Sequence, residues 1–248
     1  MSYVKVKHTL AKLALDATEH LDRAWVADAL LAYAELSRDG GSVDLAAVAR
    51  AARVPAEDVR RMVEATRLFD VADHGRAIAL AAPHRPFLSY LRRQAARTAA
   101  AVRQLRGERP PEVPAEIWRA AALFDAGLFF ECHEYLEDIW RATPGPERSF
   151  YHGLVQAAAG CYHLEKGNLH GARTLLAKAM AKLEPFAPEY RAVDVAAFLA
   201  GLRSLRSSLE TGVAPPDGVA FPPLPLAGSS QASPAHARGT SARRRPPG

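Results

Sequence analysis

The side chains with the most chemical potential lie in one short run, FFECHEYLEDIW, from Phe129 to Trp140. The run holds His133 and four carboxylates between aromatic residues. At about 100° per residue, a helix places His133 and Glu137 on its apolar face, between Trp140 and Phe130. The other three carboxylates fall together on another side, which predicts that they are solvated: Glu131, Glu134 and Asp138.

A second set of polar residues lies on the helix expected over residues 147–166. His152, Gln156 and His163 share one side of it, beside small residues that allow another helix to approach closely. If the two helices pack antiparallel, His133 and Glu137 can face Gln156 and His163. We therefore predict a ligand-binding cluster that also includes Trp140 and that His152 and Tyr162 could extend: His133, Glu137, Trp140, Gln156 and His163.

One chemistry for this cluster is metal binding. His133, Glu137 and His163 would supply three ligands to a divalent zinc, iron or manganese ion, with Gln156 or water completing its shell. HEYLE resembles the HExxH of zinc peptidases but lacks the second histidine, which disfavours a peptidase. A ferritin-type di-metal site is also disfavoured, because only one carboxylate faces inward.

Three readings without a metal remain open. The cluster could bind a small polar or anionic ligand against an apolar wall of Phe129 and Trp140. It could be a buried hydrogen-bond network that fixes the register of two helices. It could also use His133 as an acid or base oriented by Glu137, but we find no nucleophile, phosphate loop or cofactor motif beside it. The sequence thus assigns no catalytic residue and favours a protein that is not an enzyme.

The elements that must position these residues form a helical bundle. Two segments superpose at an offset of 40 residues, FDAGLFFECHEYL from Phe124 and LEKGNLHGARTLL from Leu164. In each, a helix ends before a glycine and a small residue follows five positions later, as in tetratricopeptide-type (TPR-like) hairpins. We expect two hairpins and a capping fifth helix, over residues 114–125, 128–141, 147–166, 169–184 and 188–210.

The first region predicts a different order of elements. A helix over 25–37, a short helix from Asp44, a helix over 55–68 and a hairpin turning at residues 73–75 resemble a winged helix-turn-helix domain. That resemblance implies DNA contact through residues 44–80, with three arginines as donors: Arg60, Arg61 and Arg67. Glu57 and Asp58 oppose it, because they place carboxylates at the end of the helix that would approach the bases.

Composition and charge bound the whole chain. The 248 residues carry a formal net charge of +5, which divides into +5 over 1–110, −3 over 111–212 and +3 over 213–248. We predict a mainly α protein with a winged-helix-like domain and a linker helix over 1–110, a compact bundle over 111–212 and a disordered Pro/Ser/Arg tail over 213–248. Two cysteines in apolar patterns and the lack of a leader or spanning segment favour the cytoplasm. The partners these features allow are a protein, DNA or a second copy of the chain, with no membrane.

One family resemblance covers residues 115–180. The run from Phe124 to Trp140, followed by GLVQ and HLEKGNLHGA, resembles domain-of-unknown-function family 309, a compact helical domain. Asp125 stands where that family usually has asparagine. The resemblance implies an all-helical bundle with a shared polar cluster, and no established reaction. The positions that match its pattern are Phe124, Gly127, Phe129, Phe130, His133, Glu134, Glu137, Trp140, Gly153, Gln156, His163, Gly167, Asn168, Gly171 and Ala172.

Overall fold

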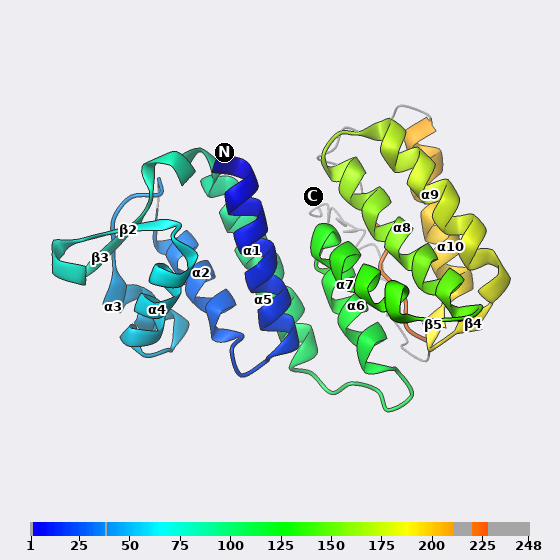
Figure 1. Cartoon of the computed structure of the whole chain (residues 1–248), viewed down its shortest axis with the longest axis horizontal. Helices are drawn as coiled ribbons and strands as arrows, with labels where there is room; N and C mark the ends of the chain where they lie inside the picture. Colours follow the sequence, from blue (N-terminus) through cyan, green and yellow to red (C-terminus); the bar gives the residue numbers. More distant parts are fainter. Residues whose placement is uncertain (1, 38, 211–219, 228–248) are drawn as a thin grey trace, which may run out of the picture.

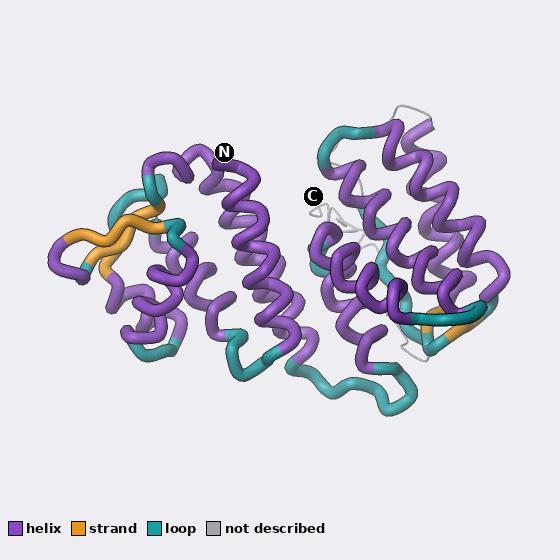
Figure 2. Tube along the Cα trace, viewed as in Figure 1, coloured by secondary structure: helices purple, strands orange, loops and turns teal. Residues whose placement is uncertain are grey.

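The protein is mainly α, as the sequence predicts. A computed structural model describes residues 2–37, 39–210 and 220–227, and within them ten α-helices and five short strands (Figures 1 and 2). Among these helices, none combines the length and apolar character needed to cross a bilayer. The buried apolar residues form one large cluster in the C-terminal half, another in the N-terminal half and a small third one.

The N-terminal half contains a small antiparallel sheet beside three helices. The elements are α2 (Trp25–Leu36), β1 (Val43–Asp44), α3 (Leu45–Ala52), α4 (Ala56–Thr66), β2 (Phe69–Ala72) and β3 (Ala77–Leu80). The strands lie in the order β1-β3-β2, with Val43 opposite Ile78 and Phe69 opposite Leu80. Asp44 begins α3 by accepting a hydrogen bond from the backbone of Ala47 at 2.8 Å. The winged-helix assignment itself stays a prediction.

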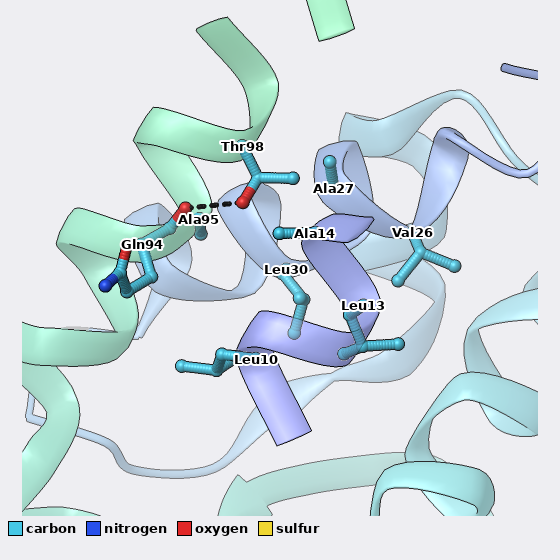
Figure 3. A pocket seen from close by; sticks show the side chains of 9 residues that line it. All are labelled: Leu10, Leu13, Ala14, Val26, Ala27, Leu30, Gln94, Ala95 and Thr98. Atoms are coloured by element: carbon cyan, nitrogen blue, oxygen red, sulfur yellow. Dashed lines mark hydrogen bonds between the residues drawn. The ribbon is translucent and has the colours of Figure 1, made fainter. Parts of the chain in front are cut away.

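Two long helices lie between this sheet and the C-terminal half. One is α1 (Ser2–Glu19), a helix that the sequence patterns above did not predict, and the other is α5 (Leu88–Leu105). Figure 3 shows apolar side chains of α1, α2 and α5 pointing toward one another, among them Leu10, Leu30 and Ala95. Farther along α1, Ala14 belongs to the C-terminal cluster instead. The first helix therefore packs against both halves.

The C-terminal half is built from two helical hairpins. They are α6 (Ala115–Asp125) with α7 (Phe129–Ala142), and α8 (Glu147–Glu165) with α9 (Leu169–Leu183). Gly127 and Gly167 make the turns at φ +75° and +73°, a left-handed conformation that glycine adopts without a Cβ penalty. The predicted small residues after the turns, Cys132 and Ala172, are fully buried. The two cysteines are free and buried, as expected.

The fifth predicted helix begins later than the sequence suggests. Residues 189–194 form a hairpin of β4 (Glu189–Tyr190) and β5 (Val193–Asp194), and the helix is α10 (Val195–Glu210). Arg191 and Ala192 make the turn with positive φ, and the Asp194 side chain accepts from the backbone of Ala197 at 2.8 Å. An acidic residue that caps a helix start thus fixes the boundary that apolar periodicity had placed seven residues too early.

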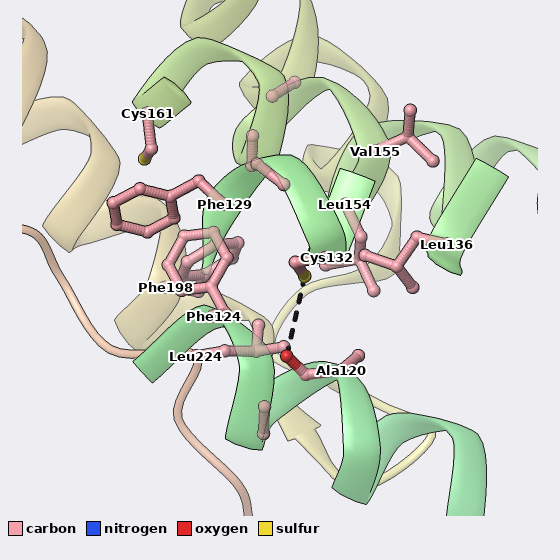
Figure 4. Close-up of a cluster of buried hydrophobic side chains, with 14 of the residues drawn as sticks. Ala120, Phe124, Phe129, Cys132, Leu136, Leu154, Val155, Cys161, Phe198 and Leu224 are labelled. Atoms are coloured by element: carbon pink, nitrogen blue, oxygen red, sulfur yellow. Dashed lines mark hydrogen bonds between the residues drawn. The ribbon is translucent and has the colours of Figure 1, made fainter. Parts of the chain in front are cut away.

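Part of the predicted disordered tail is packed on the bundle. Residues 220–227, which we call the strap, carry Leu224 and Leu226 into the C-terminal core at 1% and 8% exposure. Figure 4 shows Leu224 beside Phe124 and Phe198. The expectation of disorder is therefore wrong for the strap, because its three apolar side chains offset the composition of the residues around it. The remaining residues of the predicted tail, 213–219 and 228–248, and the last two of the predicted bundle, 211–212, lie outside the described structure.

Candidate functional site

The predicted cluster falls on the paired helices α7 and α8. They run antiparallel, since Phe130 contacts Tyr162 near one end with ring centroids 5.4 Å apart, and Trp140 contacts His152 near the other at 4.3 Å. Between these contacts, half-buried polar side chains from both helices reach the surface. We call this the α7–α8 face and define it by His133, Glu137, Trp140, His152 and Gln156.

The structure brings His133 and Glu137 together, with Glu134 as their neighbour. The possible ligand atoms of these three side chains lie within 4.8 Å of one another. His133 Nδ1 is 3.2 Å from a Glu134 oxygen, and Glu137 pairs with Arg141 at 2.9 Å. His133 and Glu137 are about three-quarters covered, whereas the Glu134 side chain is 45% exposed. The arrangement could hold a divalent cation through one nitrogen and two carboxylate oxygens, all from one helix.

His163 has another partner, at the turn between α8 and α9. Its Nδ1 lies 2.8 Å from the side-chain nitrogen Nδ2 of Asn168. The side-chain oxygen Oδ1 of Asn168 accepts a hydrogen bond from the backbone N–H of Gly171 at 2.9 Å. A side chain on Gly171 would collide with His163 and Asn168. The residues His163, Asn168 and Gly171 therefore build the beginning of α9. The helical projection placed His163 on the correct helix. It could not show that Asn168, three residues beyond the end of α8, would contact the His163 ring.

Trp140 and Gln156 both contact His152. The Trp140 and His152 rings stack with an interplanar angle of 25°, and Gln156 Nε2 is 3.2 Å from His152 Nε2. Partial burial, Lys182 and Arg148 lower the pKa of His152. The imidazole is therefore held neutral more readily than a free histidine, and a neutral ring can accept from the Gln156 amide. Arg148 adds a cation 5.1 Å from the Trp140 ring.

Glu131 is the functional candidate that the sequence reasoning missed. The projection predicts a solvated side chain, yet Glu131 is only 1% exposed. Neither carboxylate oxygen has a hydrogen-bond partner among the described residues. Burial raises the pKa of Glu131 to about 7 and Glu165 raises it further, while the backbone of Glu131 itself, Arg97 and Lys7 oppose the shift. The group therefore changes charge near neutral pH.

Helices α1 and α5 explain why Glu131 is covered. Lys7 of α1 lies 3.5 Å from the centroid of the Phe130 ring, and Arg97 of α5 binds Glu165 of α8 at 2.6 Å. The Lys166 ammonium donates to the Tyr3 hydroxyl at 2.6 Å. We call this contact between the halves the junction. The sequence signal for α1 itself is the apolar spacing of Val6, Leu10 and Ala14, which is typical of a helix that packs against other elements.

The arginines proposed for DNA contact are largely engaged by their own helix. Arg60 lies 3.5 Å from Glu57, and Arg61 pairs with Asp58. Arg67 follows the end of α4 in a left-handed conformation, and its carbonyl accepts from Lys5 at 3.3 Å. The carboxylates that the sequence set against DNA binding thus neutralise two of the three candidate donors.

Comparison with known proteins supports the resemblance in the C-terminal half. Residues 117–175 match the model of a family described as "Domain of unknown function (DUF309)". The chain is also similar to the uncharacterized protein YpuF of Bacillus subtilis (strain 168), with 39% identity over 67 residues, which are 27% of this chain and 37% of that protein. The chain thus matches little more than a third of that relative's length. No solved structure matches the chain.

Proposed function

We propose that this protein is a non-enzymatic binding or adaptor protein whose α7–α8 face engages a protein partner. The observation that carries the proposal is the stacked pair of Trp140 and His152, with Arg148 beside the indole. Tryptophan and arginine are enriched among the residues that dominate the binding energy of protein interfaces. Here they lie half-buried or exposed on a rigid pair of helices, so a partner can reach them without any rearrangement of the bundle.

The neighbouring side chains supply the polar part of such an interface. His133 and Glu137 continue the face along α7, and Gln156 continues it along α8. The face therefore joins an aromatic pair at one end to hydrogen-bond donors and acceptors along both helices, and protein-binding surfaces combine these two kinds of group. The free and buried cysteines fit the cytoplasmic setting that we infer with it.

The test is affinity capture from the native cell, comparing wild type with Trp140→Ala. We expect the variant to lose at least roughly 10-fold of the specifically captured partner, because truncating an aromatic residue that dominates the binding energy of an interface costs about 2 kcal/mol or more. Arg203→Ala on α10, away from this face, is the matched control and should capture as wild type does. The proposal is wrong if no partner is captured while the purified protein turns over a metabolite in a broad screen.

A second candidate is a ligand- or metal-responsive DNA-binding regulator. The order of α2, β1, α3, α4, β2 and β3 and the strand order β1-β3-β2 favour it, as does the donor cluster of His133, Glu134 and Glu137. Two measurements test it: the metal content after purification without chelator, and binding to duplex DNA between roughly 50 and 200 mM salt. Glu57→Gln with Asp58→Asn should strengthen DNA binding by releasing Arg60 and Arg61. Absence of both stoichiometric metal and DNA affinity would remove this candidate.

A further inference from the structure

The strap is held on the bundle by contacts that resemble those of a bound peptide. Its sequence, AFPPLPLA over 220–227, alternates apolar side chains with three prolines. Proline fixes φ and removes the backbone donor, so such a segment favours an extended form that loses little entropy when it docks. Pro-rich segments are recognised in aromatic-lined grooves for this reason.

Each part of the strap packs against a different part of the bundle. The Phe221 ring contacts the Phe129 ring of α7, with centroids 4.6 Å apart. Pro222 lies against Gly201 of α10, where an added Cβ would come within 2.6 Å of the proline Cβ. Leu224 is buried in the core, and its backbone donates to Asp125 at the end of α6 at 2.8 Å. Together these contacts define a groove that binds both the side chains and the backbone of the strap.

The last part of the strap pairs with the β4-β5 hairpin. The Asp194 backbone donates to the Pro225 carbonyl at 3.0 Å, and the Ala227 backbone donates to Ala192 at 2.9 Å. Leu226 lies opposite Val193 in an antiparallel bridge. This is the strand-addition mode of peptide recognition, in which backbone bonds provide affinity and pockets provide specificity.

We propose that this groove is a peptide-docking site for extended, apolar, proline-interrupted segments of partner proteins, and that the strap is its intramolecular occupant. The strap follows α10 after residues 211–219, so it binds at an effective concentration in the millimolar range. A partner segment of the same chemistry must displace it. The groove lies on α6, α10, the beginning of α7 and the β4-β5 hairpin. It uses none of the residues that define the α7–α8 face, so this inference does not depend on the function proposed above.

The test measures binding of a labelled AFPPLPLA peptide to the full chain. Phe221→Ala with Leu224→Ala weakens docking of the strap, and the peptide should then bind at least roughly 10-fold more tightly than to wild type, where the strap competes. Pro223→Ala changes an exposed strap residue and is the matched control that should behave as wild type. We call the Phe221→Ala, Leu224→Ala double substitution the released variant. Adding Gly201→Ala to it fills the space that Pro222 occupies beside α10, and should abolish peptide binding while keeping α10 helical.

Two outcomes would overturn the proposal. One is a released variant that folds and binds no peptide, and the other is one that dimerises instead, which would make a second copy the occupant. If the released variant does not fold, amide exchange in the wild type decides. The Leu224 and Ala227 amides should then exchange at least roughly 10-fold faster than those of Phe198 and Leu202 in α10, because the strap opens alone. Equal protection would mean that the strap is an inseparable part of the core.

Discussion

At the scale of single residues, Glu131 shows how burial changes the chemistry of a common side chain. A carboxylate without hydrogen-bond partners is unfavourable in a covered position, so the folded protein holds a proton there more tightly than the unfolded chain does. Lys7 and Arg97 reduce this effect without pairing directly with the carboxylate. The native state is therefore less stable when Glu131 is charged than when it is protonated.

Glu131→Gln should flatten part of the pH dependence of stability. The folded pKa is about 7 against an ordinary value of 4.5, so this group's favourable contribution is complete below pH 4.5 and is lost as pH rises through 7. The loss is on the order of 3 kcal/mol in the free energy of unfolding. Urea unfolding of wild type and variant between pH 5 and 8 measures the difference. Glu134→Gln, at a half-exposed site, is the control, and equal slopes for Glu131→Gln and wild type would contradict the prediction.

The sequence was sufficient for residues whose environment depends on their own helix. Helical periodicity correctly predicted that Asp138 is exposed, and the small residue expected five positions after the Gly127 turn, Cys132, lies in the core. It was insufficient for Glu131, because the helices that cover that side of α7, α1 and α5, both end at least 26 residues before Glu131. A projection of one helix contains no information about a second helix that packs on its other side.

At the scale of elements, the turn between α8 and α9 explains several positions of the family pattern without any ligand. Asn168 caps α9, His163 holds the Asn168 amide, and Gly171 leaves space for both. The sequence predicted both hairpins from the spacing of glycines and small residues. It could not distinguish a histidine that stabilises a turn from one that faces a site, because both lie at the same helical angle.

Asn168→Ala should lower the free energy of unfolding by about 1 kcal/mol, because it removes the acceptor for the Gly171 amide. Asn168→Asp keeps an acceptor at the helix start and is the matched control. Thermal and urea unfolding measure both variants.

His163→Ala should also lower the free energy of unfolding. It should leave any zinc affinity of the His133, Glu134 and Glu137 cluster unchanged when binding is measured by calorimetry. Loss of zinc binding in His163→Ala would instead show that His163 belongs to the zinc site.

At the scale of the whole molecule, the junction ties the two halves together. The Arg97 and Glu165 side chains are 22% and 16% exposed, so their ion pair is screened less by water than a surface pair. Phe130 and Tyr162 extend the contact with Lys7 above the Phe130 ring. Charge and aromatic contacts thus connect elements that composition alone assigns to separate regions.

A double-mutant cycle should detect this connection as a coupling energy. Arg97→Ala, Glu165→Ala and the double variant should give a coupling of about 1 kcal/mol in the free energy of unfolding, because the pair is partly buried. The Arg206–Glu210 pair, 3.2 Å apart and 40% and 55% exposed, is the control with an expected coupling of about 0.3–0.5 kcal/mol. Additive effects at Arg97 and Glu165 would show that the halves are not coupled through this pair.

The position of α1 also has a consequence for synthesis on the ribosome. This helix is made before the other described elements, but the side of it that includes Ala14 packs against a cluster whose remaining members lie after residue 100. At roughly 5–20 amino acids per second, the chain needs on the order of 5–20 s to reach them. During that interval the nascent helix can be covered on only one side, by α2 and later α5.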